Sequence, residues 1–224
     1  MDFTIITALF EQKTTMEFMR LGIVYAHLIA CCVAIGMVLT SDFAMIKELF
    51  KGGKSHLQDS QHMESLQKSV SAALAVLWVS GVAIIWLDIN ANGLSYLLNP
   101  KLQAKITIVM LLTFNGMLLH GLVLPALQKA GSLLKLNFSM RMFALFAGAL
   151  SGVSWFYAAM LGVGRPLSWK YSLTEILAAY PVMIVGGFAA MVLLTQWAMK
   201  REAREEQGNL AFVPAVRNPA LAAG

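Results

Sequence analysis

Long runs of apolar residues alternate with short polar segments along the chain, and this pattern predicts five membrane-spanning helices. The runs cover residues 20–40, 69–88, 99–125, 137–163 and 175–199. Each run holds about 20 or more predominantly apolar residues, which is the length that a helix needs to cross a hydrocarbon core about 30 Å thick. The predicted fold class is therefore all-α, a polytopic transmembrane bundle of five helices.

The third run carries polar side chains inside an otherwise apolar sequence. It begins with Asn99 as a candidate N-cap and Pro100 at the first helical position, and Pro125 is its expected end. Lys105 and His120 lie between these boundaries. Ionisable groups are costly inside a membrane helix, so each of the two is a candidate functional residue.

Shorter and more polar segments flank the predicted bundle, which covers residues 20–199. Residues 1–19 are too short and too polar to cross a bilayer, and they are expected to form an interfacial N-terminal arm. Residues 200–224 are polar at first and then rich in alanine, proline and asparagine. They are expected to form an exposed arm or a disordered tail.

The composition indicates an integral membrane protein and excludes a soluble enzyme. Hydrophobic residues make up 58% of the chain and charged residues 13%, whereas soluble domains have about 25% charged residues. Cys31 and Cys32 are adjacent in an apolar run, which excludes a disulfide framework and a CxxC metal site. The net charge of +5 comes from residues at the ends of the runs, where anionic lipid attracts them. The expected partner is therefore the lipid bilayer and not nucleic acid.

The distribution of lysine and arginine predicts the orientation of the bundle. Eleven of the 17 basic residues fall in the first loop, the third loop and the C-terminal tail, and six fall on the opposite side. The positive-inside rule then places the C-terminus inside and the N-terminus outside. The expected location is an inner (cytoplasmic) membrane of the bacterial type, crossed several times.

In this orientation, polar and aromatic side chains from several runs reach one level in the outer half of the membrane. His27 and Lys105 lie early in the first and third runs, and Glu175 and Tyr180 lie early in the fifth, which makes these four the candidate cofactor-binding residues. His27 is either a neutral histidine bonded to a neighbouring helix or a ligand of haem iron or another metal. His120 has the same two interpretations, but it lies about 22 Å beyond Lys105 along the helix and belongs to the inner half.

Several of these side chains also have simpler explanations. The Lys105 ammonium can extend to the membrane surface along its flexible stem. Glu175 can cap its own helix together with Ser172, and Asp88 can mark the point where the second run leaves the membrane. An interfacial aromatic belt accounts for three tryptophans, Trp86, Trp155 and Trp169.

Short motifs in three runs resemble the HemJ type of protoporphyrinogen oxidase and the related CopD-like membrane proteins. The sequence YAHLIA around His27 resembles the first span of that family, in which a histidine is implicated in haem binding. QAKI around Lys105 resembles the third span, and Glu175 ahead of PVMI resembles the last. The resemblance implies haem b binding at His27, a functional role for Lys105, and oxidation of a porphyrinogen. The fourth run and the long tail have no counterpart in the four-span plan of the family.

Three functions follow as hypotheses. The first is a membrane redox protein with b-type haem, in which His27 is an axial ligand and Lys105 is a second ligand or a propionate partner. Its electrons would pass to or from a quinone or a partner subunit. The second is a non-catalytic accessory subunit of a larger membrane complex, suggested by the arm and the tail. The third is a copper or small-solute permease, with His27, Met37, Cys31 and Cys32 as soft ligands.

Overall fold

The computed structural model describes residues 3–51 and 60–212, and every regular element within these ranges is helical. The long helices are α1 (Phe3–Lys51), α2 (Ser60–Asn92), α3 (Pro100–Leu118), α5 (Phe138–Val163) and α6 (Leu173–Phe212). The short elements are η1 (Leu94–Leu98), η2 (Leu119–Val123), α4 (Leu124–Ala130), η3 (Leu133–Lys135) and η4 (Arg165–Leu167).

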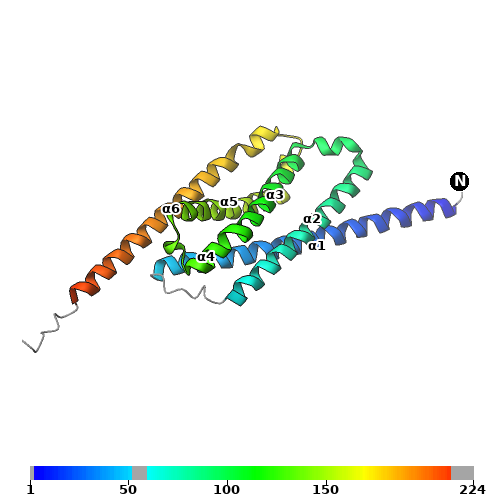
Figure 1. Ribbon diagram of the computed structural model, residues 1–224. Coiled ribbons are helices and arrows are strands. Elements are labelled where there is room, and N and C mark those ends of the chain that lie inside the picture. Colours follow the sequence, from blue (N-terminus) through cyan, green and yellow to red (C-terminus); the bar gives the residue numbers. More distant parts are fainter. Residues whose placement is uncertain (1–2, 52–59, 213–224) are drawn as a thin grey trace, which may run out of the picture.

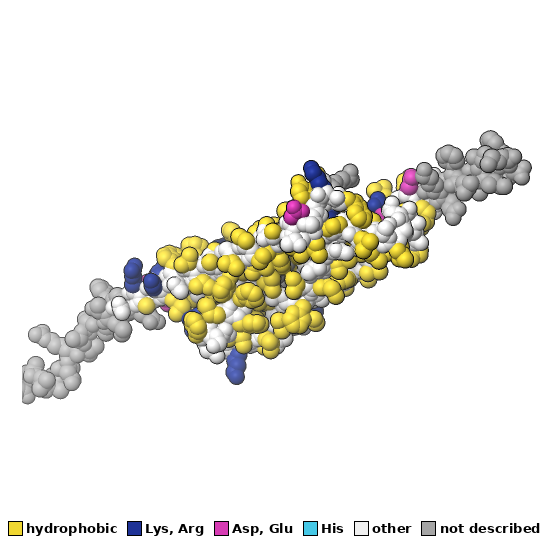
Figure 2. All heavy atoms as spheres, turned by 90° about the horizontal axis from the view of Figure 1, so that it is seen from above, with side chains coloured by type: hydrophobic (Ala, Val, Ile, Leu, Met, Phe, Trp, Pro, Cys, Tyr) yellow, Lys and Arg dark blue, Asp and Glu magenta, His cyan; other side chains and the backbone are white. Residues whose placement is uncertain are grey.

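The five predicted spans are confirmed as helices that are long and apolar enough to cross a membrane. Within the described residues they cover Thr14–Lys47, Lys68–Asn92, Pro100–Ala130, Phe138–Val163 and Leu173–Glu205. Hydrophobic side chains cover most of the face shown in Figure 2, and charged side chains are few. A soluble protein could not expose such a surface, because large apolar patches associate in water. The chain is therefore a multi-pass membrane protein.

The first and last helices are longer than predicted. Helix α1 runs from Phe3 to Lys51 without a break, so residues 3–19 belong to the same helix as the first span. Helix α6 continues to Phe212, so the first part of the predicted tail is helical, and residues 213–224 lie outside the described residues. The free ends of α1 and α6 project from opposite ends of the bundle (Figure 1).

The helices pack as two groups. Helix α1 packs mainly on α2, whereas α3, α5 and α6 pack on one another. Ala104 and Ile108 of α3 and Leu161 of α5 have no exposed surface and form the centre of the second group. Trp155 is buried where the two groups meet, against Ala34 and its neighbours, and so it does not belong to an interfacial belt.

The third predicted span begins as expected but extends beyond its predicted end. The Asn99 side chain accepts a hydrogen bond from the Lys101 backbone N–H at 3.0 Å, which confirms the N-cap. After α3, the π-helical turn η2 leads into α4, where Pro125 stands in the first turn. Proline has no backbone N–H, and it is tolerated in the first turn of a helix because the N–H groups there have no partner within the helix. The helix instead ends at Gly131, whose φ of 74° is the left-handed conformation typical of a helix C-terminus.

A buried hydrogen bond between α3 and α5 gives a test of this packing. The Asn115 side chain donates from Nδ2 to the Ala147 carbonyl oxygen at 2.8 Å. Because such bonds between membrane helices contribute about 0.6 kcal/mol on average and about 1.7 kcal/mol at most, Asn115→Ala is expected to lower the free energy of unfolding by about 0.6–1.7 kcal/mol. Denaturation in mixed micelles measures this loss. Asn90→Ala is the control, since exposed Asn90 bonds within its own helix, and an equal loss in both variants would contradict the prediction.

Candidate functional site

His27 of α1 is held in place by a hydroxyl of α2. Its Nδ1 lies 2.8 Å from the Ser80 Oγ. The Ser80 hydroxyl donates its own hydrogen to the Val76 carbonyl oxygen at 2.5 Å, so the Ser80 oxygen accepts from a protonated Nδ1. This arrangement selects the tautomer of His27 with an unprotonated Nε2, whose lone pair can accept a hydrogen bond or bind a metal.

Lys105 of α3 lies close to the same part of α1. Its ammonium interacts electrostatically with His27 and with Cys31, one turn further along α1. On the other side, Nζ lies 3.9 Å from the point where a Cβ on Gly162 of α5 would be. No hydrogen bond or ion pair joins Lys105 to the described part of the chain. Lys105 is thus within electrostatic range of His27, and among the described residues the ammonium has no acidic partner.

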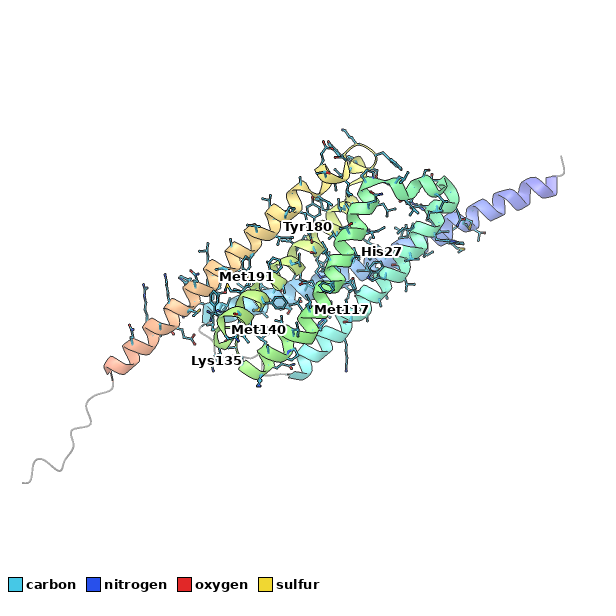
Figure 3. The ribbon with its side chains drawn as sticks, turned by 45° about the horizontal axis from the view of Figure 1, so that its top comes forward. His27, Met117, Lys135, Met140, Tyr180 and Met191 are labelled. Carbon is cyan, nitrogen blue, oxygen red and sulfur yellow. The ribbon has the colours of Figure 1, made fainter. Side chains whose placement is uncertain are left out.

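Tyr180 belongs to the packing between α5 and α6. Its hydroxyl lies 2.7 Å from the Ser154 Oγ, and its ring meets that of Tyr157 edge to face with the centroids 5.3 Å apart. The Tyr157 hydroxyl donates to the Ile176 carbonyl, about one turn before Pro181 interrupts the hydrogen bonds of α6. Hydrogen bonds from a neighbouring helix of this kind stabilise a membrane helix that contains proline. Figure 3 shows Tyr180 on α6, and it is not grouped with His27.

Glu175 caps α6. Its Oε2 accepts hydrogen bonds from the backbone N–H and the hydroxyl of Ser172, both at 2.8 Å, and the Ser172 Oγ accepts from the Glu175 backbone N–H at 3.3 Å. The predicted capping box is therefore present. Glu175 is exposed, and all these bonds are local to the start of the helix.

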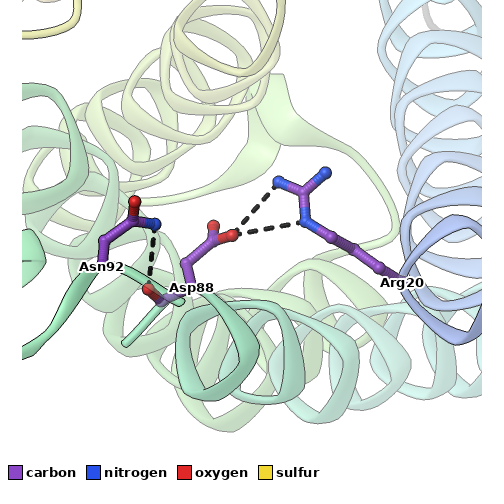
Figure 4. Close-up of polar contacts among 3 residues, drawn as sticks. All are labelled: Arg20, Asp88 and Asn92. Carbon is purple, nitrogen blue, oxygen red and sulfur yellow. Dashed lines mark hydrogen bonds and ion pairs between the residues drawn. The ribbon is translucent and has the colours of Figure 1, made fainter. Parts of the chain in front are cut away.

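An ion pair joins the first two helices at the end of α2 (Figure 4). The Arg20 guanidinium donates from Nη2 to the Asp88 Oδ1 at 3.1 Å, and the Asn92 side chain donates to the Asp88 backbone carbonyl at 3.0 Å. Tyr96 of η1 lies beside this pair. Burial, a hydrogen bond to Asp88 and the negative charge of Asp88 raise the pKa of Tyr96 to about 12, although Arg20 opposes the shift. Asp88 therefore ties α1, α2 and η1 together.

A cavity of about 460 Å³ lies between the two helix groups. Its walls come mainly from the later part of α1, the first half of α2, the second half of α3 with η2, and α5. Most of the lining is apolar and includes Trp78, Trp155 and four methionines, Met37, Met45, Met117 and Met191. Trp78 donates from Nε1 to the Thr113 hydroxyl at 3.1 Å, so α2 and α3 are linked at the cavity wall.

Asp42 and His120 are the ionisable side chains among the described residues that line this cavity. The Asp42 Oδ2 lies 3.8 Å from the point where a Cβ on Gly152 would be, so its carboxyl faces α5. No hydrogen bond or ion pair joins Asp42 to the described part of the chain. His120 lies in η2, and its Nδ1 is buried without a hydrogen-bond partner among the described residues.

The sequence predicts that His120 lies far from Lys105, but it does not identify Asp42 as a candidate functional residue. The predicted first span ends at Thr40, which assigns Asp42 to a solvated loop. In the structure α1 continues to Lys51, and Asp42 lies within Thr14–Lys47, the part of the helix that is apolar enough to cross a membrane. The spacing from Val38 could have indicated this position. Residues four apart share one side of a helix, so an unbroken helix places Asp42 on the same face as Val38 of the first span.

Within the described ranges, no group of three or more histidine, cysteine, aspartate or glutamate side chains is arranged to hold a metal ion. Comparisons of the chain with protein-family models, with curated proteins and with solved structures find no match. The resemblance to HemJ-type oxidases and CopD-like proteins therefore stays a prediction that is carried by the short motifs alone.

Proposed function

We propose that this protein is a membrane redox protein that binds b-type haem between α1 and α3. His27 would bind the haem iron, and Lys105 would pair with a haem propionate. The observation that carries the proposal is the Lys105 ammonium, unpaired among the described residues, beside an imidazole that Ser80 holds with Nε2 unprotonated.

The chemistry of these side chains fits the two functional parts of haem b. Histidines that bind metals usually form a hydrogen bond through the other ring nitrogen, which fixes the tautomer and the orientation of the ring. Ser80 provides that bond to His27. A cation without an anionic partner is unfavourable within a membrane span, and a propionate would supply the missing negative charge and accept a charge-assisted hydrogen bond.

The roles of the surrounding residues follow from their contacts. Ser80 holds the His27 ring in one tautomer, so that its Nε2 lone pair is available. Lys105 supplies a positive charge beside α1 and α5. Bound haem would supply one-electron chemistry, and the electron partner proposed for it is a quinone or a neighbouring membrane subunit. Tyr180 and Glu175 act in this proposal through helix packing and capping, since their hydrogen bonds are made to α5 and to Ser172.

Optical spectra of the purified protein test the proposal. We expect a Soret band and a shift of the visible bands on reduction with dithionite. His27→Ala is expected to remove most of the bound haem, because it removes the ligand, and Ser80→Ala is expected to weaken retention by about 10- to 100-fold, the usual effect of losing the hydrogen bond that orients a ligand.

The control variant is His62→Ala, which replaces a histidine outside the membrane spans. It is expected to retain the full haem content. A wild-type protein that carries no haem after expression with added haem precursor, or a His27→Ala protein with unchanged haem content, would contradict the proposal. The first of these results would favour the accessory-subunit hypothesis, and native mass spectrometry of the solubilised membrane would then test for a stable complex.

A further inference from the structure

The cavity between the two helix groups is separate from the proposed haem site. Neither His27 nor Lys105 lines it, and the residues that do lie further along α1 and α3. Its volume of about 460 Å³ falls within the range of small-molecule sites, which is about 300–1,000 Å³. Such sites are mostly apolar and have a few polar groups that orient the ligand. The lining of this cavity is also mostly apolar, and Asp42 and His120 are among its few polar side chains.

The charge of the cavity wall indicates what kind of ligand it suits. Asp42 supplies an acidic group, and no lysine or arginine is present among the described lining residues. An acidic side chain inside a membrane span is costly and usually has a partner or a function. Asp42 has no such partner in the described part of the chain. A negatively charged ligand would meet repulsion here, whereas a cation would supply the missing charge.

The apolar part of the wall also suits a cation with an aromatic or aliphatic body. Trp78 and Trp155 contribute indole rings, whose faces attract organic cations. The four lining methionines are flexible and polarisable, and they adapt to ligands of different shapes. The buried His120 Nδ1 is a second polar atom without a partner among the described residues, and an N–H group of a ligand would satisfy it.

From this arrangement we propose that the cavity binds a lipophilic organic monocation, with the Asp42 carboxylate as its counter-ion and the two tryptophans as walls for its apolar body. Ser71 and Ala75 of α2 and Met117 of α3 line the cavity and are exposed. The cavity is thus open toward the lipid between α2 and α3, and a ligand dissolved in the bilayer reaches it from that side. The proposal is independent of haem binding.

The test uses two probe ions with the same shape and opposite charge. Tetraphenylphosphonium and tetraphenylborate are titrated into the purified full-length protein in detergent, and binding is measured by equilibrium dialysis against empty micelles. We expect saturable binding of tetraphenylphosphonium at one site per chain and at least tenfold weaker binding of tetraphenylborate. A short-chain quinone, which is neutral, is expected not to compete with the cation.

Variants of Asp42 locate the site. Asp42→Asn is expected to weaken tetraphenylphosphonium binding at least tenfold, and Asp42→Glu, which keeps the charge, is expected to restore it to within a few-fold. Glu205→Gln is the matched control, because it removes an acidic charge from the exposed end of α6, away from the cavity. Ala75→Trp is expected to slow binding by obstructing the opening, whereas Val79→Trp, at an exposed position of α2 that does not line the cavity, is expected to leave it unchanged.

Three results would overturn the proposal. These are equal binding of the two probe ions, displacement of the cation by the neutral quinone, and an Asp42→Asn protein that binds the cation as the wild type does. If Asp42→Asn does not fold, the comparison of the two ions on the wild-type protein still decides the charge preference, and Asp42→Glu with Ala75→Trp decides the location. None of these measurements depends on bound haem, so failure of the redox proposal leaves the test intact.

Discussion

Leu161→Ala is expected to lower the free energy of unfolding of the bundle by about 2–5 kcal/mol. Leu161 has no exposed surface and packs with Ala104 and Ile108 of α3. Leucine gains little by moving from lipid tails into a protein interior, so its contribution in a membrane comes mainly from close packing. Truncation leaves a hole whose lining atoms lose their contacts, which is the same loss of dispersion energy that follows a truncation in a soluble core.

The matched control is Leu193→Ala. Leu193 lies on α6 with 66% of its surface exposed, and in a bilayer that surface meets lipid. The free energy of unfolding is expected to fall by less than about 0.5 kcal/mol, as for other surface substitutions. Reversible unfolding in mixed micelles compares the two. Similar losses in both variants would mean that α3 and α5 do not pack through Leu161.

Lys105→Met is expected to change the protein in opposite directions with and without haem. In the haem-free protein, the variant removes from a candidate membrane span an ammonium that is unpaired among the described residues. Insertion scales assign a lysine a cost of about 2.5–3.5 kcal/mol at mid-membrane. The variant is expected to recover part of this free energy, which would raise the melting temperature of the haem-free protein. In the haem-loaded protein, the variant removes the propionate partner, and haem affinity is expected to fall at least tenfold.

Two measurements on the same preparation check this pair of effects. Thermal denaturation of the haem-free protein gives the first, and haem titration followed at the Soret band gives the second. Lys135→Met, which neutralises an exposed lysine outside the spans, is expected to change neither quantity. A haem-free Lys105→Met protein that is less stable than the wild type would show that the ammonium stabilises the fold without any ligand.

The number of spans could be predicted from the sequence because apolar length alone determines whether a helix can cross a bilayer. The helix ends were harder to predict. Pro125 marks no end, since it falls in the first turn of α4 after the π-helical turn. The polar residues after Thr40 also mark none, because α1 continues to Lys51. Polar side chains at the membrane surface are compatible with an unbroken helix, so a change of composition does not locate its last residue.

The partners of the candidate residues could not be predicted for a different physical reason. In a soluble helix an apolar stripe identifies the buried face. In these spans the lipid-facing side is apolar as well, so periodicity does not distinguish core from surface. The hydrogen bond from His27 to Ser80 and the shared cavity of Asp42 and His120 depend on the rotation of each helix, which only the packing sets. Trp155 illustrates the same limit, because its buried position does not follow from its type.

The π-helical turn Leu119–Val123 has a consequence for how this protein tolerates deletions. A π-helical turn accommodates one residue more than an α-helical turn does. Deleting Gly121 would let the segment return to ordinary α-helical winding, while the side chains before and after it keep their faces. Deleting one residue from the regular part of α3 would instead rotate all later side chains of the span by about 100°. Val123 and Leu127, which are buried in the structure, would then turn toward lipid. In a version of this chain that is one residue shorter in this span, the missing residue is therefore expected to lie in the π-helical turn.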